Sequence, residues 1–222
     1  MPAAGIGERA RSKESQEPKQ FRLLRGRPLL EWAVDAVAAA GCSPIVVVLP
    51  PGLDESPPEF GSLYPQVVFA TGGDTRQASV GAGVALINAD VVVVHDAARP
   101  LATKDLVQEV VETLHSSDVD AVVPGIPMDE TIKEVGADDR VLRTVDRSSL
   151  WRVQTPAAFR TAVLKAAHAR ADAESFVGTD ESQLVERFVD GRIRIIPGRR
   201  DNLKVTFPND LAVAEAMLEG LR

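Results

Sequence analysis

The apolar residues of this chain form two kinds of segment that alternate along the sequence. Short, nearly continuous apolar runs predict buried strands at Ile45–Leu49, Gln66–Ala70, Val91–Val94 and Ala121–Val123. Segments with apolar residues at helical spacing predict helices between them: one from Pro28 to Gly41, one from a cap at Asp74 to about Asn88, and one capped by Thr103. Apolar strands separated by amphipathic helices are typical of a parallel sheet covered on both faces. The pattern therefore predicts the α/β class.

A different pattern follows these elements. Glu130–Val135 and Val141–Val145 alternate apolar and polar residues on either side of Gly136-Ala137-Asp138-Asp139. This alternation predicts a β-hairpin rather than another strand–helix crossover. A two-stranded hairpin is not stable alone, so we expect it either to lie on the domain or to contact a partner subunit.

The rest of the chain returns to helices and strands. We expect a helix near Arg160–Ala171, a helix capped at Thr179-Asp180-Glu181, strands at Arg192–Ile196 and Leu203–Thr206, and a final helix from Pro208. The 222 residues show no internal repeat and have the length of one domain. We therefore predict a single domain over 1–222, with an arm inserted at about 126–150.

The composition, with 45% apolar and 26% charged residues, is that of an ordinary globular protein, and no apolar run is long enough to span a membrane. The net charge of -7 argues against a surface that coats nucleic acid, so we expect neither a nucleic-acid nor a membrane partner. The single cysteine, Cys42, excludes an internal disulfide and, without a recognisable secretory segment, predicts a cytoplasmic location. An anionic ligand would need a local basic cluster, and one is present near the N-terminus: Arg9, Arg11, Lys13, Lys19, Arg22, Arg25 and Arg27.

Part of this basic cluster belongs to a glycine-rich turn, Ala3-Ala4-Gly5-Ile6-Gly7-Glu8-Arg9, which is followed by Pro18-Lys19-Gln20. Glycines allow backbone N–H groups to approach phosphate oxygens, and Arg9 and Lys19 add two cations. The spacing matches neither the P-loop nor the dinucleotide-binding pattern. The turn is therefore either a phosphate cradle or an ordinary surface turn.

A second candidate site, His95-Asp96-Ala97-Ala98-Arg99-Pro100, comes directly after the valine strand. It stands at the carboxyl end of a strand, where open α/β sheets bind ligands. Asp96 is either a ligand for Mg²⁺ that bridges phosphates, or a cap for the next turn with Arg99 as its ion-pair partner. The three histidines are scattered and share no metal-binding spacing with Cys42, which argues against a zinc site.

Two further segments carry polar residues without a decisive pattern. The turn Gly72-Gly73-Asp74-Thr75-Arg76-Gln77-Ala78-Ser79 could contact a base or a phosphate, although a plain N-capped helix would explain the same residues. Lys204 lies in a predicted strand, where a lysine usually points to solvent.

Together, these motifs resemble those of the 2-C-methyl-D-erythritol 4-phosphate cytidylyltransferases, enzymes of non-mevalonate isoprenoid biosynthesis. Each motif alone is weakly specific, but the ordered set is strongly specific. The resemblance covers nearly the whole chain, in family order: Pro2–Arg9, Pro18–Gln20, Gly72–Val80, His95–Pro100, Thr131–Lys133, Thr144–Arg147, Gln154–Pro156, Thr179–Glu181 and Asn202–Thr206.

The resemblance implies a Rossmann-like nucleotidyltransferase fold with a mostly parallel central sheet, helices on both faces and a projecting β-hairpin dimerisation arm. It also implies CTP and a sugar-alcohol phosphate, methylerythritol phosphate, as substrates, Mg²⁺ as cofactor, and a homodimer formed through the arm. By motif position, the cytidine nucleotide would contact Ala3, Ala4, Gly5, Gly73, Asp74, Ser79 and Ala97. The remaining roles would be Arg9, Lys19 and Lys204 as catalytic cations at the α-phosphate, Asp96 at the metal, and Arg99 with the partner's arm residues Thr131 and Arg147 at the sugar phosphate.

The sequence departs from the family at its start. The family has a hydrophobic strand before the glycine-rich turn, whereas this sequence reaches the turn at Ala3. We therefore expect the first strand of the sheet to be missing, which would leave backbone groups of its neighbours without partners.

Two alternative functions remain. A ribitol 5-phosphate cytidylyltransferase would share most of these motifs, but Thr131-Ile132-Lys133 and His95–Pro100 favour methylerythritol phosphate. A catalytically inactive nucleotide-binding regulatory subunit would not need cations around the α-phosphate, so the retention of a full polar set argues against it: Arg9, Lys19, Asp96 and Lys204.

Overall fold

The computed structural model describes residues 1–4, 18–52 and 64–220. Its main sheet has five strands in the order β11–β6–β10–β5, with β9 paired to β6, and three further strand pairs are β1–β2, β3–β4 and β7–β8. The strands are β1 (Leu23–Leu24), β2 (Arg27–Pro28), β3 (Ile45–Leu49), β4 (Val67–Thr71), β5 (Val91–Val94), β6 (Ala121–Pro127), β7 (Ile132–Val135), β8 (Val141–Val145), β9 (Trp151–Val153), β10 (Ala157–Arg160) and β11 (Ile193–Pro197). The helices are η2 (Lys19–Phe21), α1 (Leu29–Ala39), α3 (Arg76–Ala85), α4 (Lys104–Ser116), α5 (Thr161–Ala173), α6 (Glu181–Val189) and α7 (Asp210–Gly220).

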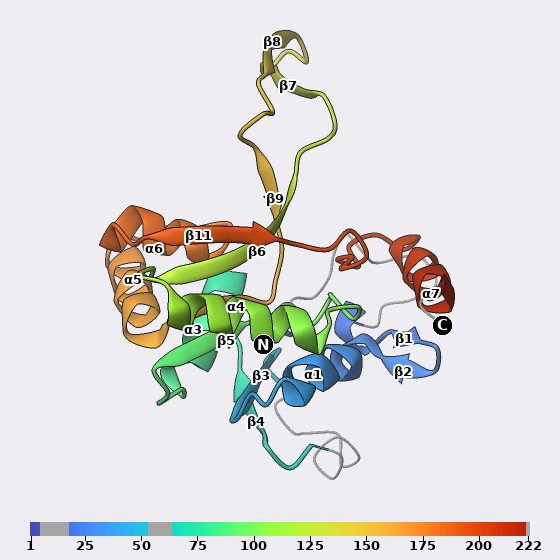
Figure 1. Cartoon of the computed structure of the whole chain (residues 1–222), viewed down its shortest axis with the longest axis vertical. Coiled ribbons are helices and arrows are strands. Elements are labelled where there is room, and N and C mark those ends of the chain that lie inside the picture. Colours follow the sequence, from blue (N-terminus) through green and yellow to red (C-terminus); the bar gives the residue numbers. More distant parts are fainter. Residues whose placement is uncertain (5–17, 53–63, 221–222) are drawn as a thin grey trace.

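Helices cover both faces of the main sheet (Figure 1). Ala121 and Val123 of β6 share an apolar cluster with α3, α5 and α6, whereas Val122 between them belongs to a cluster with α4. This division follows from the strand itself, because successive side chains point to opposite faces. The predicted α/β fold, with helices on both faces of a central sheet, is confirmed. The main sheet is mixed rather than mostly parallel, because β9 and β10 run antiparallel to their neighbours and only β11 is parallel to β6. Among the described helices, none has the length and apolarity needed to cross a membrane.

Most predicted elements lie where the apolar pattern placed them. β3 and β5 have the predicted bounds, β4 begins one residue later than predicted, and β6 extends further, to Pro127. The predicted Thr103 cap is confirmed, since its hydroxyl accepts a hydrogen bond from the Leu106 N–H at 3.3 Å.

Two predictions about local structure are wrong. Thr75, not Asp74, caps α3, because the Thr75 hydroxyl accepts from the Ala78 N–H at 3.0 Å. The segment Leu203–Thr206 is not a strand: Val205 N–H donates to Ala98 O at 2.8 Å, but the segment joins no ladder in the described part of the chain. An extended segment becomes a strand only where a neighbouring strand offers an open edge.

The strand β10 was not predicted, and it runs antiparallel to both of its neighbours. Ala157 pairs with Val94 of β5, and Phe159 pairs with Ala121 of β6. Its four residues contain no β-branched side chain and follow Pro156, so the local sequence gives little sign of a strand. Because β10 begins opposite the end of β5, residues 154–156 are brought to the carboxyl end of β5.

No strand pairing connects β3 with β5 in the described residues. Met1–Ala3 runs beside β3: the Met1 ammonium donates to Val46 O at 2.7 Å, Val48 N–H to Met1 O at 2.9 Å, and Ala3 N–H to Val48 O at 2.8 Å. Beyond Met1, a cavity of about 440 Å³ lies between β3 and β5, and its lining includes Val46, Val48 and all four valines of β5. The first strand was expected to be missing. At its place beside β3, the described residues form a single parallel bridge, between Pro2 and Val48.

The predicted hairpin, β7–β8, is confirmed and extends away from the main sheet (Figure 1). β9 pairs with the end of β6 at its base. Apolar side chains are exposed along this arm, including Val141 at 57%, Leu142 at 63% and Trp151 at 40%. Such a set is unusual on a free surface and is typical of an interface.

Candidate active site

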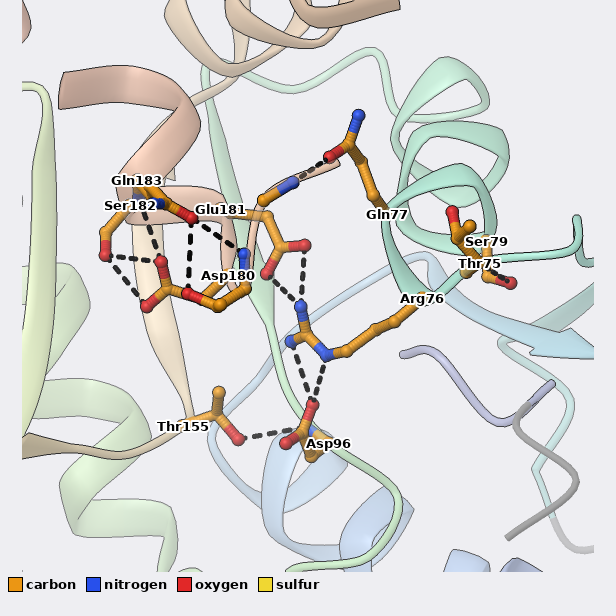
Figure 2. Close-up of polar contacts among 12 residues, drawn as sticks. Thr75, Arg76, Gln77, Ser79, Asp96, Thr155, Asp180, Glu181, Ser182 and Gln183 are labelled. Carbon is orange, nitrogen blue, oxygen red and sulfur yellow. Dashed lines mark hydrogen bonds and ion pairs between the residues drawn. The ribbon is translucent and has the colours of Figure 1, made fainter. Parts of the chain in front are cut away.

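Asp96 is the centre of the candidate site, at the carboxyl end of β5. Its carboxylate is only 9% exposed, and its backbone N–H donates to Thr155 Oγ1 at 3.0 Å. This bond ties the end of β5 to the turn before β10, which explains why the antiparallel strand matters for the site. Figure 2 shows Asp96 between Thr155 and the side chain of Arg76.

Two cations hold the carboxylate of Asp96. Arg76, on the first turn of α3, donates to Oδ1 from Nε at 3.2 Å and from Nη2 at 2.9 Å. Lys204 Nζ lies 2.7 Å from the other oxygen, Oδ2. Arg76 also donates from Nη1 to both oxygens of Glu181 at 2.8 Å, so that one guanidinium joins two carboxylates from different elements (Figure 2).

Burial and charge act in opposite directions on these groups. Burial favours the neutral acid, yet the charges of Arg76 and Lys204 outweigh it and hold the pKa of Asp96 well below its ordinary value. For Glu181, burial dominates and raises the pKa, although Arg76 opposes the shift. Burial would lower the pKa of Arg76, but Asp96 and Glu181 raise it. The Asp96 carboxylate is therefore an anion at neutral pH.

A single buried carboxylate fits Mg²⁺ only in combination with phosphate oxygens. Mg²⁺ is commonly bound by one or two carboxylates together with substrate phosphates. The part of the chain that the structure describes contains no group of three or more His, Cys, Asp or Glu residues able to hold a metal. Asp96 thus suits a nucleotide-borne Mg²⁺, provided that one of its oxygens exchanges its present partner.

The described start of the N-terminal turn, Ala4, lies against the second glycine turn. A Cβ atom at Gly72 would lie 2.3 Å from Ala4 Cβ, and one at Gly73 would lie 2.7 Å from Ala78 Cβ. Glycine is required at both positions because the Cβ atoms of the neighbouring alanines leave no room for a side chain. The buried Ser79 hydroxyl donates to Thr75 O at 2.9 Å, which braces the second turn.

The remaining predicted nucleotide contacts fall on both sides of these turns. Ala3 is buried, and its carbonyl accepts from Gln20 Nε2 at 2.6 Å. Ala97 packs in the same apolar cluster as Ala3, and Asp74 is exposed at the second turn. The structure therefore brings Ala3, Ala4, Gly73, Ser79 and Ala97 to one end of the fold.

The cap interpretation required an ion pair between the side chains of Arg99 and Asp96, and the structure does not contain this pair. The Arg99 guanidinium is buried and donates to Asn202 O at 2.7 Å and to Val153 O at 3.5 Å. Burial lowers its pKa, partly offset by the charge of Asp96. Arg99 N–H does donate to Asp96 O at 3.0 Å, so the backbone of Asp96 opens a turn while its side chain faces Arg76 and Lys204.

Thr131 and Arg147 are exposed on the projecting arm, where Arg147 Nη1 donates to Asp129 O. The arm that carries them extends away from the main sheet (Figure 1). Gly5 and Arg9 lie outside the described residues. Lys19 begins η2, and only its backbone is described.

Two charged residues of the site were not predicted as functional, although both belong to the family motifs of the sequence. Arg76 and Glu181 are separated by 105 positions, and only the fold shows that they share a salt bridge. The one sequence feature that could have pointed to Arg76 and Glu181 is that each is a charged residue at the start of a predicted helix. Thr155 was likewise in a motif without an assigned role.

The buried carboxylate of Asp96 and the lysine beside it lie at the carboxyl end of β5, where open α/β sheets bind ligands. The fold is that of the Rossmann-like nucleotidyltransferases. The family model of 2-C-methyl-D-erythritol 4-phosphate cytidylyltransferase, IspD, matches residues 1–220. The chain belongs to this family.

Relatives and solved structures agree with this assignment. The chain is 38% identical over 224 residues to the 2-C-methyl-D-erythritol 4-phosphate cytidylyltransferase of Bacillus velezensis, covering 99% of this chain and 94% of that protein. A crystal structure of the enzyme of the same name from Thermus thermophilus is similar with a TM-score of 0.80 and 36% identity, over 91% of this chain and 94% of that one. The 4-diphosphocytidyl-2C-methyl-D-erythritol synthase of Anaerococcus prevotii gives a TM-score of 0.83 at 26% identity, over 98% and 95%.

Proposed function

We propose that this chain transfers CMP from CTP to 2-C-methyl-D-erythritol 4-phosphate, giving 4-diphosphocytidyl-2-C-methyl-D-erythritol and pyrophosphate. The activity follows from membership of the cytidylyltransferase family over the whole chain. The observations that support it in the structure are the contact of Asp96 with Lys204 and the close approach of Ala4 to Gly72.

The reaction is an in-line displacement at the α-phosphorus. A phosphate oxygen of methylerythritol phosphate attacks, a new P–O bond forms, and the bond to the β-phosphate oxygen breaks to release pyrophosphate. The attacking phosphate is already an anion near neutral pH, so the step needs no general base. It needs instead groups that neutralise the charge around phosphorus.

We assign this neutralisation to Lys204, Lys19 and Arg9. Lys204 is supported by its position at Asp96, and the other two by their places in the N-terminal motif. Preorganised contacts of this kind are typically worth roughly 3–4 kcal/mol each in the transition state. Mg²⁺, bound through Asp96 and the nucleotide phosphates, would supply further charge neutralisation.

Backbone groups of the two glycine turns would hold the nucleotide. Ala4 and Gly72 approach closely with no bulky side chain between them, which would let a base or a phosphate come near the backbone. We assign this role to Ala3, Ala4, Gly5, Gly73, Asp74, Ser79 and Ala97.

We further propose a homodimer in which each arm completes the partner's site. A projecting hairpin with exposed apolar side chains favours burial against another subunit. Thr131 and Arg147 would then bind the sugar phosphate of the other subunit, with Arg99 nearby.

Pyrophosphate release from CTP tests the function directly. Activity with methylerythritol phosphate should exceed activity with ribitol 5-phosphate under the same conditions. The opposite preference would assign the ribitol reaction, and binding of CTP with no turnover on either acceptor would indicate an inactive regulatory subunit.

A further inference from the structure

The two cations on Asp96 are held in different ways. Arg76 contacts Oδ1 through two N–H groups and contacts both oxygens of Glu181 through Nη1. Lys204 contacts Oδ2, and Asp96 is its only ion-pair partner among the described residues. Arg76 is therefore anchored from two sides, whereas Lys204 is held from one (Figure 2 shows the Arg76 contacts).

Burial strengthens this asymmetry. The Glu181 side chain is 3% exposed and stands at the first position of α6, which Asp180 caps through its bond from Gln183 N–H at 2.9 Å. If Arg76 moved away, it would leave a buried carboxylate without its partner, which is strongly unfavourable. The Lys204 side chain is 39% exposed, so it can leave Asp96 and remain solvated or meet another anion.

We propose that Arg76 and Glu181 are positioning residues that give the two oxygens of Asp96 separate roles. Arg76, fixed by Glu181, keeps Oδ1 occupied. Oδ2 is the exchangeable oxygen: Lys204 moves from it to the α-phosphate of the nucleotide, and Oδ2 becomes available to Mg²⁺. This proposal rests on the proposed function, because it requires a triphosphate and a divalent cation at the site.

The test is the coupling between Mg²⁺ and CTP, measured by calorimetry without any turnover. The affinity for CTP is determined with EDTA and with saturating Mg²⁺, and the ratio of the two dissociation constants gives the coupling. Glu181→Gln removes the charge that anchors Arg76, so that Arg76 can spread over both oxygens of Asp96 and compete with the metal. We expect the coupling to fall about tenfold, within the usual range for linked sites, while CTP binding in EDTA stays the same or tightens.

Three other variants complete the design. Arg76→Lys keeps the charge but cannot bridge Asp96 and Glu181, so it should lose the same coupling even if Glu181→Gln folds poorly. Glu186→Gln, an exposed residue on the same helix, is the matched control and should leave the coupling unchanged. Asp96→Asn should abolish the coupling, because an amide is a poorer ligand for a hard cation.

The outcomes separate the two proposals. Failure of the unaltered protein to bind CTP at all would overturn the proposed function. Mg²⁺-coupled CTP binding that persists in full in both Glu181→Gln and Arg76→Lys would overturn only the positioning role. An equal loss of affinity with EDTA and with Mg²⁺ would also overturn it, because that pattern indicates general damage to the site.

Discussion

Replacing Lys204 by alanine should separate catalysis from metal binding. Lys204 Nζ lies 2.7 Å from Asp96 Oδ2 in a partly exposed position, so its removal deletes one cation and frees one carboxylate oxygen. If Lys204 moves to the α-phosphate, its charge acts mainly in the transition state. Loss of one preorganised contact of this kind corresponds to roughly 3–4 kcal/mol, or a decrease in kcat on the order of 10²–10³. The Mg²⁺ concentration for half-maximal activity should not rise, because Oδ2 is no longer shared.

Steady-state pyrophosphate release, with Mg²⁺ and CTP varied in turn, gives both quantities. Lys104→Ala, an exposed lysine at the start of α4, serves as the control and should behave as the unaltered protein. A kcat of Lys204→Ala within about threefold of normal would refute the transition-state role, since the expected loss is far larger. A Mg²⁺ requirement that rises together with the loss of kcat would refute the exchange at Oδ2.

Three further predictions concern the arm, the buried His168 and the cavity. Arg147→Ala and Lys19→Ala homodimers should each be nearly inactive. Mixing them under subunit exchange should restore partial activity, because one site of the heterodimer carries neither change. No recovery, despite exchange confirmed by mass, would place Arg147 outside the partner's site. Burial lowers the pKa of His168, so the unfolded state binds a proton that the folded state does not, and the free energy of unfolding should fall as pH drops below about 6.5. In urea titrations at several pH values, this free energy should depend less on pH in His168→Gln. The same pH dependence in both proteins would refute this contribution. Four apolar, β-branched residues joined ahead of Met1 should enter the 440 Å³ cavity beside β3. They should raise the free energy of unfolding by roughly 2 kcal/mol, measured as a Tm several degrees higher. An extension of serine and asparagine should not raise the Tm, and equal Tm values for the two extended proteins would contradict strand insertion.

The sequence by itself determined the parts of the fold whose signal is local. The β3 and β5 strands and the Thr103 cap depend on side chains within a few positions of one another, and all three were predicted where they occur. The order of the motifs likewise identified the family before any contact was known. Asp96 could be placed at the carboxyl end of a strand because a valine run directly precedes it.

Tertiary structure decided what depends on distant neighbours. β10 is a strand because it pairs with β5 on one side and with β6 on the other. Leu203–Thr206 is not a strand, because it pairs with no strand among the described residues. The ion-pair partners of the Asp96 side chain are Arg76 and Lys204 rather than Arg99, and they lie 20 and 108 positions away along the sequence. Glu181 could not be assigned from its own helix, since its role comes from burial against a guanidinium on another element. Periodicity and capping act over a few residues, whereas burial and ion pairing act across space, and only the folded chain defines that space.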